Sequence, residues 1–201
     1  IGACAIGERE LKGVLDRYGR AAFDAACGRL LDAAEQTARA VVARIADGTY
    51  RAEWYVHDDG IDHDGSWTIR LAVTVSGEEI TFDFSESDEQ AAGYVNAPLA
   101  VTLSSVMIAF FMIADQDLPH NDGIMRVVKV VAREGTIVHP SYPAPTGFGN
   151  HLSDQIAAVI MLALSEAVPE RVTASWNHLL ATLVSGWDER RDSAYVDILI
   201  N

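Results

Sequence analysis

Hydrophobic residues recur every three or four positions through residues 8–46, which is the spacing of one buried face of an α-helix. Gly19 interrupts this stretch, and glycine is a poor helix former, so we expect the helix to break there. Asp47 and Gly48 then provide a typical helix end. The pattern predicts a helical segment over residues 1–48.

The period of the pattern changes to two after this segment, as expected for strands with one buried face. Strands are predicted over residues 50–56, 67–75 and 79–84, and a tight hairpin over residues 76–78 joins the last two. Residues 97–114 carry no charge, which reaches the lower length limit of a membrane span. Hydroxyl side chains interrupt this run and acidic residues close it, so we predict a fully buried central helix instead.

The remaining elements follow from turn residues, prolines and shorter apolar runs. They are a strand over 124–131, an extended proline-rich loop over 139–146, a helix from a cap at Asn150 or Ser153 to about residue 167, and two strand-like runs within 172–200. Together the elements predict an α+β fold with helices first, then mostly antiparallel strands with two inserted helices. We expect residues 49–201 to form an α+β part of the same larger subunit as the helical segment.

The chain has 201 residues, 49% of them hydrophobic, and a net charge of -14. This composition supports a proper core and argues against nucleic-acid or anionic-membrane partners, which require a basic surface. Cys4 and Cys27 are too few for a disulfide framework, so we expect a cytoplasmic protein. The chain starts at Ile1 without a methionine and stops at Asn201 after a strand-like run, so we expect an internal piece of a longer subunit.

An acidic stretch over residues 57–64 holds six potential metal ligands within eight positions. Its spacing fits neither a calcium loop nor a zinc pattern, and Asp-Gly pairs between two strands are typical of turns. We predict an exposed, mobile loop without a catalytic role.

Two turns are better candidates for a site. His120 and Asn121 lie on a proline-fixed corner after the apolar run, with Arg126 close behind; the alternative is a plain Asn-Asp-Gly turn with a surface histidine. Gly149, Asn150 and His151 precede a predicted helix, whose free N–H groups suit an anion; the alternative is a simple helix cap. We predict that these six residues bind substrate, with Asn150 near His120 and Asn121 in space.

These motifs belong to an ordered series that covers about half of the chain. The series is Thr81-Phe82-Asp83-Phe84-Ser85, Gln90, Gly93, Asn96-Ala97-Pro98, Pro119-His120-Asn121-Asp122-Gly123 with Arg126, Gly135-Thr136-Ile137-Val138-His139-Pro140, and Gly147-Phe148-Gly149-Asn150. In this order it resembles the hydantoinase B/oxoprolinase family. The resemblance implies part of a subunit of an ATP-dependent multi-subunit enzyme that hydrolyses cyclic amides such as hydantoins, 5-oxoproline or lactams.

The same resemblance implies a hetero-oligomer in which a hydantoinase A-like partner subunit binds ATP and Mg. It places the divalent metal ion outside residues 1–201, and we assign no metal ligand within them. Two alternatives stay open: a subunit of an ATP-dependent acetone or acetophenone carboxylase, and a non-catalytic scaffold subunit. For the carboxylase Trp176 and Trp187 would line an apolar pocket; the other interpretation of these tryptophans is packing in a strand and its loop.

Overall fold

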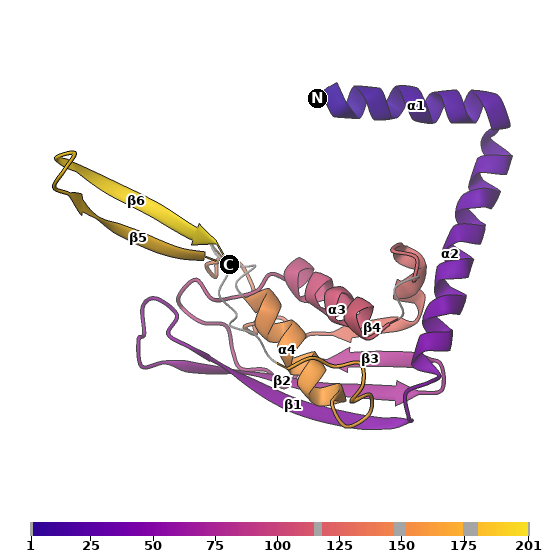
Figure 1. Cartoon of the computed structure of the whole chain (residues 1–201). Helices are drawn as coiled ribbons and strands as arrows, with labels where there is room; N and C mark the ends of the chain where they lie inside the picture. The colour runs from indigo at the N-terminus through magenta and orange to yellow at the C-terminus, as the bar shows by residue number, and fades with distance from the viewer. Residues whose placement is uncertain (1, 115–117, 147–151, 175–180, 201) are drawn as a thin grey trace.

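The computed structural model describes residues 2–114, 118–146, 152–174 and 181–200 (Figure 1). A four-stranded sheet in the order β1-β2-β3-β4 carries helices on one face, and β5 and β6 form a separate two-stranded sheet. The helices are α1 (Gly2–Tyr18), α2 (Arg20–Val42), α3 (Leu99–Ile113), α4 (Ser153–Leu164) and the 3-10 helix η1 (Asp122–Arg126). The strands are β1 (Gly48–His57), β2 (Ser66–Ser76), β3 (Glu79–Asp83), β4 (Val128–Val131), β5 (Ala181–Asp188) and β6 (Ser193–Ile200). The predicted α+β class is confirmed.

The predicted break between the first two helices is confirmed at Gly19. Its φ of 79° lies in the left-handed region, which glycine adopts without strain. No residue of α1 is buried, whereas the second half of α2 buries Ala34, Ala38, Val41 and Val42. Helix α2 ends at Val42, short of the predicted end, and a turn then leads into β1.

The first three strands form an antiparallel meander that follows the predicted pattern. The β1–β2 register runs from Gly48 opposite Val75 to His57 opposite Ser66. The predicted hairpin between β2 and β3 is confirmed, and Gly77 starts its two-residue loop with a φ of 60°. A positive φ at this position suits the twist of the flanking strands.

The prediction of a strand over residues 124–131 was wrong in its first half. Residues 122–126 form η1, because the Asn121 side chain accepts a hydrogen bond from the Gly123 N–H and turns the chain at the surface of α2. A Cβ atom on Gly123 would lie 2.1 Å from the Leu31 carbonyl oxygen, so only glycine permits this close approach. The strand that follows, β4, pairs with β3 in parallel, which makes the sheet mixed.

The parallel pairing of β3 with β4 fixes where the loops meet. Strand β1 runs in the same direction as β3, because both are antiparallel to β2. The carboxyl ends of β1, β3 and β4 therefore lie at one edge of the sheet. The loops that leave these strands run to β2, α3 and α4, so this edge gathers residues 58–65, 84–98 and 132–146.

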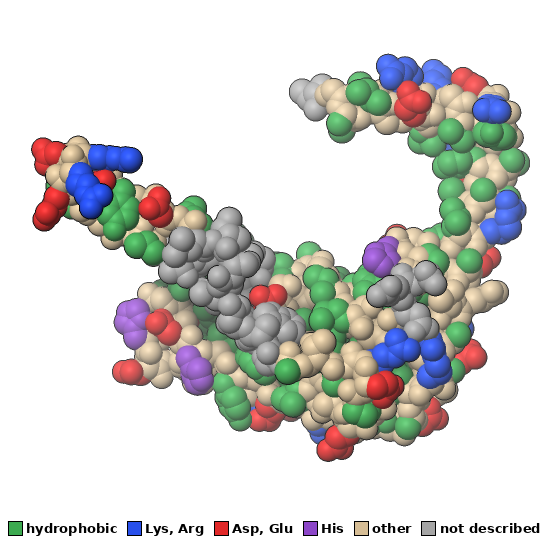
Figure 2. Space-filling model, in the orientation of Figure 1, with side chains coloured by type: hydrophobic (Ala, Val, Ile, Leu, Met, Phe, Trp, Pro, Cys, Tyr) green, Lys and Arg blue, Asp and Glu red, His purple; other side chains and the backbone are tan. Residues whose placement is uncertain are grey.

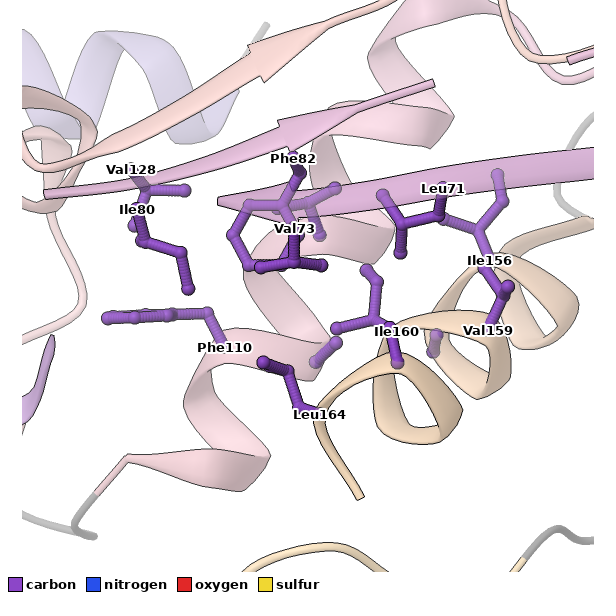
Figure 3. Packing of buried hydrophobic residues seen from close by; sticks show 14 of the residues in the cluster. Leu71, Val73, Ile80, Phe82, Phe110, Val128, Ile156, Val159, Ile160 and Leu164 are labelled. Carbon is purple, nitrogen blue, oxygen red and sulfur yellow. The ribbon is translucent and has the colours of Figure 1, made fainter. Parts of the chain in front are cut away.

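Apolar side chains of the sheet and of two helices form one core between them. Figure 3 shows the inner face of the sheet packed against α3 and α4. The labelled members are Leu71, Val73, Ile80, Phe82 and Val128 from the sheet, Phe110 from α3, and Ile156, Val159, Ile160 and Leu164 from α4. This layer is the main apolar contact that holds the helices on the sheet.

The prediction that the uncharged helix is fully buried was wrong. Helix α3 buries one face, including Phe110, but Ile108 and Met112 on its other face are 49% and 42% exposed. The reason is that the helices cover the sheet in a single layer, so the outer face of α3 has no covering element among the described residues. None of the described helices is both long and apolar enough to cross a membrane.

The two faces of α3 make a matched test of this packing. Replacing Phe110 by Ala should lower the free energy of unfolding by about 3–5 kcal/mol, because it opens a cavity in the core. Replacing Ile108 by Ala, two residues away on the exposed face, should change it by less than about 1 kcal/mol. Denaturant unfolding measures both, and equal losses would contradict the assigned orientation of α3.

Candidate functional site

His120 lies on the corner after α3, as predicted, and its ring is exposed. It stacks on the Phe111 ring with a centroid distance of 3.8 Å and an interplanar angle of 29°. The corner therefore adjoins the carboxyl end of α3. Its imidazole remains accessible from solvent.

Asn121 and Arg126 hold this corner against α2. The Asn121 side chain accepts the Gly123 N–H at 2.9 Å and donates to the Leu30 carbonyl oxygen at 3.4 Å. Arg126 forms ion pairs with Asp32 at 2.8 Å and Glu35 at 2.9 Å. These contacts give both residues a structural task on the side of the corner that faces α2.

The second predicted turn lies mostly outside the described residues. Gly149, Asn150 and His151 belong to residues 147–151, so the structure does not place them. Helix α4 begins just after them at Ser153, and Leu152, not Asn150 or Ser153, occupies its N-cap position without a side-chain cap. The first N–H groups of α4 thus have no capping side chain among the described residues, as an anion site requires.

The two predicted turns adjoin the same helix. The Ser153 hydroxyl lies 3.0 Å from the Ser105 hydroxyl of α3, and His120 stacks on Phe111 of the same helix. Six residues separate Ser105 from Phe111, which corresponds to about 9 Å along a helix axis. The structure brings the flanks of the two turns to one helix, and the direct approach of Asn150 to His120 stays a prediction.

The carboxylase alternative involves two tryptophans, of which the structure describes one. Trp176 lies outside the described residues. Trp187 belongs to β5 in the separate two-stranded sheet and is 60% exposed. An apolar pocket lined by both residues stays a prediction.

Asn96 is buried. It belongs to one of the motifs found in the sequence, but the sequence did not indicate its role. Its side chain accepts the Ala91 N–H at 2.8 Å and donates to the carbonyl oxygens of Ala91, Gly93 and Pro145 at 2.9–3.0 Å. The bond to Pro145 ties the loop after β3 to the chain just before residues 147–151. Asn96 therefore positions the approach to the glycine-rich segment.

Asp59 corrects the prediction that residues 57–64 form a wholly exposed loop. Its side chain is fully buried and accepts the N–H groups of Asp62 at 2.7 Å, Ile61 at 2.9 Å and Gly93 at 2.6 Å. The Asp59 carbonyl oxygen also accepts the Tyr94 N–H. A Cβ atom on Gly93 would lie 1.9 Å from that carbonyl oxygen, so glycine is required there. The acidic loop is bound to the same edge of the sheet as Asn96.

The pKa of Asp59 lies below its ordinary value for a physical reason. The hydrogen bond from the Asp62 N–H lowers it most, and the bonds from Ile61 and Gly93 lower it further, against the opposing effect of burial. The ionised carboxylate is therefore the form that holds the loops. Described residues 2–114, 118–146, 152–174 and 181–200 contain no group of three or more His, Cys, Asp or Glu arranged to hold a metal ion.

A hollow of 550 Å³ lies on the outer face of the sheet, opposite the face that α3 and α4 cover. It is lined by Thr49, Arg51, Ala52, Glu53, Arg70, Leu71, Ala72, Thr74, Thr81, Asp83 and Glu86. Arg70, which lines the hollow, pairs with Glu53 at 3.3 Å and with Asp88, and the contact with Asp88 raises the pKa of Arg70. This arrangement satisfies Arg70 within the sheet, so we place the candidate site at the loops instead.

Comparison with known proteins agrees with the ordered motifs. The sequence model described as hydantoinase B/oxoprolinase matches residues 1–200, and the chain therefore belongs to this family. Caprolactamase subunit beta from Pseudomonas jessenii is 33% identical over 202 residues, which cover 99% of this chain and 34% of that protein. 5-Oxoprolinase 1 from Arabidopsis thaliana is 25% identical over 171 residues, covering 78% of this chain and 13% of that protein.

Two solved structures share the fold. The crystal structure of ATP-dependent caprolactamase from Pseudomonas jessenii matches with a TM-score of 0.83 and 32% identity, over 97% of this chain and 34% of that chain. The nucleotide-free structure of acetone carboxylase matches with a TM-score of 0.79 but 17% identity, over 97% of this chain and 28% of that chain, which shows the fold alone. The chain spans about a third of the length of caprolactamase subunit beta.

The buried carboxylate predicts a defined dependence of stability on pH. A lowered pKa in the folded state means that the contribution of Asp59 is complete above the ordinary carboxyl pKa of about 4 and is lost as the pH falls through the lower folded value. Asp59→Asn should lower the melting temperature at pH 7 by roughly 5 °C, because the amide cannot accept all three N–H groups. Its melting temperature should also fall less than that of the unmodified chain below pH 4.

Asp64→Asn is the matched control, since Asp64 is exposed in the same loop and the substitution removes the same charge. Thermal unfolding followed by circular dichroism between pH 7 and pH 3 compares the three proteins. Identical curves for Asp59→Asn and Asp64→Asn would refute the structural role of Asp59.

Proposed function

We propose that the chain is part of a hydantoinase B-like subunit of an ATP-dependent multi-subunit enzyme that hydrolyses cyclic amides of the hydantoin, 5-oxoproline or lactam type. The observation that carries this proposal is the match to one family over residues 1–200, together with 33% identity to caprolactamase subunit beta across nearly the whole chain. Relatives named as caprolactamase and 5-oxoprolinase support the cyclic amide as the substrate class.

The proposed task of this chain is to hold an anionic intermediate. In the proposed reaction the partner subunit transfers phosphate from ATP to the amide oxygen, and water adds to the activated carbon. The ring C–N bond then breaks to leave an amine and an acyl phosphate, and a second water releases phosphate and the carboxylate. The N-terminus of α4 supplies backbone N–H donors that no side chain of the described residues caps, and Gly149 and Asn150 precede it in the sequence. These neutral donors suit a chain with a net charge of -14, which offers no general positive field.

The edge of the sheet that gathers residues 58–65, 84–98 and 132–146, the loop edge, supplies the rigid support for this site. Asn96 fixes the Pro145 carbonyl group just before residues 147–151, and Ser105 contacts Ser153 just after them. We place His120, Asn121 and Arg126 at the other end of α3, where the exposed imidazole of His120 is free to meet a substrate. Asn121 and Arg126 would serve the site chiefly by holding this corner on α2.

The partners follow from the family. The word "subunit" in the name of caprolactamase subunit beta supports a hetero-oligomer, and we propose a hydantoinase A-like partner that binds ATP and Mg. A divalent metal ion would polarise the reacting carbonyl group, and we place it outside these residues. We further propose a cytoplasmic location, where ATP is available, and a small-molecule substrate without nucleic-acid or membrane partners.

The proposal can be tested by exchanging a segment of caprolactamase, the relative with a crystal structure, for this chain. This chain would replace the matched third of caprolactamase subunit beta, and the purified hybrid enzyme would be assayed for ATP-dependent opening of caprolactam, hydantoin and 5-oxoproline. We expect turnover of at least one cyclic amide. Turnover only of acetone or acetophenone with bicarbonate would replace the proposal by a ketone carboxylase, and an assembled hybrid without any turnover would favour a scaffold.

Asn150 tests the anion site within the same hybrid. If its amide donates to the transition state, Asn150→Ala should reduce turnover about a hundredfold. If Asn150 only supports the start of α4, the loss should be about 1 kcal/mol of stability with turnover kept. Ser165→Ala at the far end of α4 is the control and should leave turnover unchanged; a stability loss without a rate loss in Asn150→Ala would refute the assignment.

A further inference from the structure

Helix α1 carries an apolar stripe that nothing in the described chain covers. Cys4, Gly7, Leu11, Val14 and Tyr18 follow one another at spacings of three and four, which places them on one helix face. All five are exposed, and Leu11, Val14 and Tyr18 keep 46%, 40% and 58% of their surface open to solvent. Figures 1 and 2 show α1 standing away from the sheet beyond the bend at Gly19.

A short helix with glycines needs packing against another surface to be stable in water, and the exposed stripe of α1 lacks it among the described residues. An isolated helix of 17 residues is marginal in water, and Gly7 and Gly13 weaken it further. A Cβ atom on Gly7 would meet nothing within 4 Å, so the chain's own packing gives no reason for glycine at that position. A partner surface that approaches α1 closely at Gly7 would supply the reason.

The sequence of α1 is complementary to itself in the antiparallel direction. If two copies of α1 pair so that residue numbers facing each other sum to 25, Leu11 meets Val14 of the second copy and Tyr18 meets Gly7. The large ring then lies over the residue without a side chain. Glu10 and Arg17 share one flank of the stripe, and antiparallel packing brings each Glu10 beside the other copy's Arg17.

Charge also favours a second copy at this position. Helix α1 has three acidic residues (Glu8, Glu10, Asp16) and three basic ones (Arg9, Lys12, Arg17), so its net charge is zero. The whole chain has a net charge of -14, and two copies therefore repel each other over most surfaces. The helix α1 is a segment at which two such chains can approach without this repulsion.

We propose that α1 is a self-association surface, on which α1 of one copy packs antiparallel against α1 of a second copy through Leu11, Val14 and Tyr18. The inference is independent of the proposed reaction, because none of these residues belongs to the candidate site. The contacts of Glu10 with Arg9 and of Arg17 with Tyr18 within one copy lie at the surface and do not prevent this pairing.

Charge reversal on the flank of the stripe tests the proposal. Glu10→Lys places a lysine beside Arg17 of the second copy at two symmetric positions, and Arg17→Glu places a second glutamate beside Glu10. Each variant alone should dimerise about tenfold more weakly than the unmodified chain. An equimolar mixture of the two should regain the affinity, because both contacts between unlike chains become attractive; such rescue cannot come from misfolded protein.

Asp16→Lys and Arg9→Glu are the matched controls, since they make the same charge changes on the face of α1 opposite the stripe. Sedimentation equilibrium of the 201-residue chain from about 1 to 100 µM should show a dimer that the controls alter less than about twofold. A monomer throughout this range, or a dimer that Leu11→Asp and both flank variants leave intact, would overturn the proposal.

Discussion

Two buried polar side chains, Asp59 and Asn96, hold together the three loops at the edge of the sheet where β1, β3 and β4 end. An unpaired carboxylate or amide inside a protein is costly, so each must be met by hydrogen bonds. Asp59 meets three backbone N–H groups from two loops, and Asn96 meets backbone groups from two loops, including the Pro145 carbonyl. Because these partners belong to the connections after β1, β3 and β4, the three loops are fixed as one unit beside the candidate anion site.

The mixed sheet makes this arrangement possible. Three strands deliver their carboxyl ends to one edge, and the helices that follow two of them, α3 and α4, return over the same face. Phe110, Ile156 and Ile160 belong to the apolar core that these helices share with the sheet, and this packing holds both helices on its inner face. The N-terminus of α4 is thereby held at the loop edge by the core on one side and by Ser105 on the other.

Local pattern predicted the elements that depend on neighbours in the chain: the meander, its glycine hairpin, the break at Gly19 and the C-terminal pair of strands. It failed where a distant contact decides. Residues 122–126 became η1 because Asn121 and Gly123 meet α2, about 90 residues earlier. Asp59 is buried because Gly93, 34 residues later, donates to it, and no sequence pattern around Asp59 predicts that contact. The order of the motifs was enough to predict the family. The role of Asn96, in contrast, could be seen only from the contacts that its side chain makes in the folded loops.

The central claim is that Asp59 and Asn96 lock these loops into a rigid edge, and hydrogen exchange of single backbone amides measures this directly. The Gly93 and Ala91 N–H groups, which donate to these two side chains, should exchange as slowly as amides within β3 or α4. The Asp64 N–H donates only to the exposed Asp62 carboxylate at 3.2 Å in the same loop, so it should exchange much faster. If the Gly93 and Ala91 amides exchange as fast as Asp64 while the β3 amides stay protected, the loops are not locked and the account of the site is wrong.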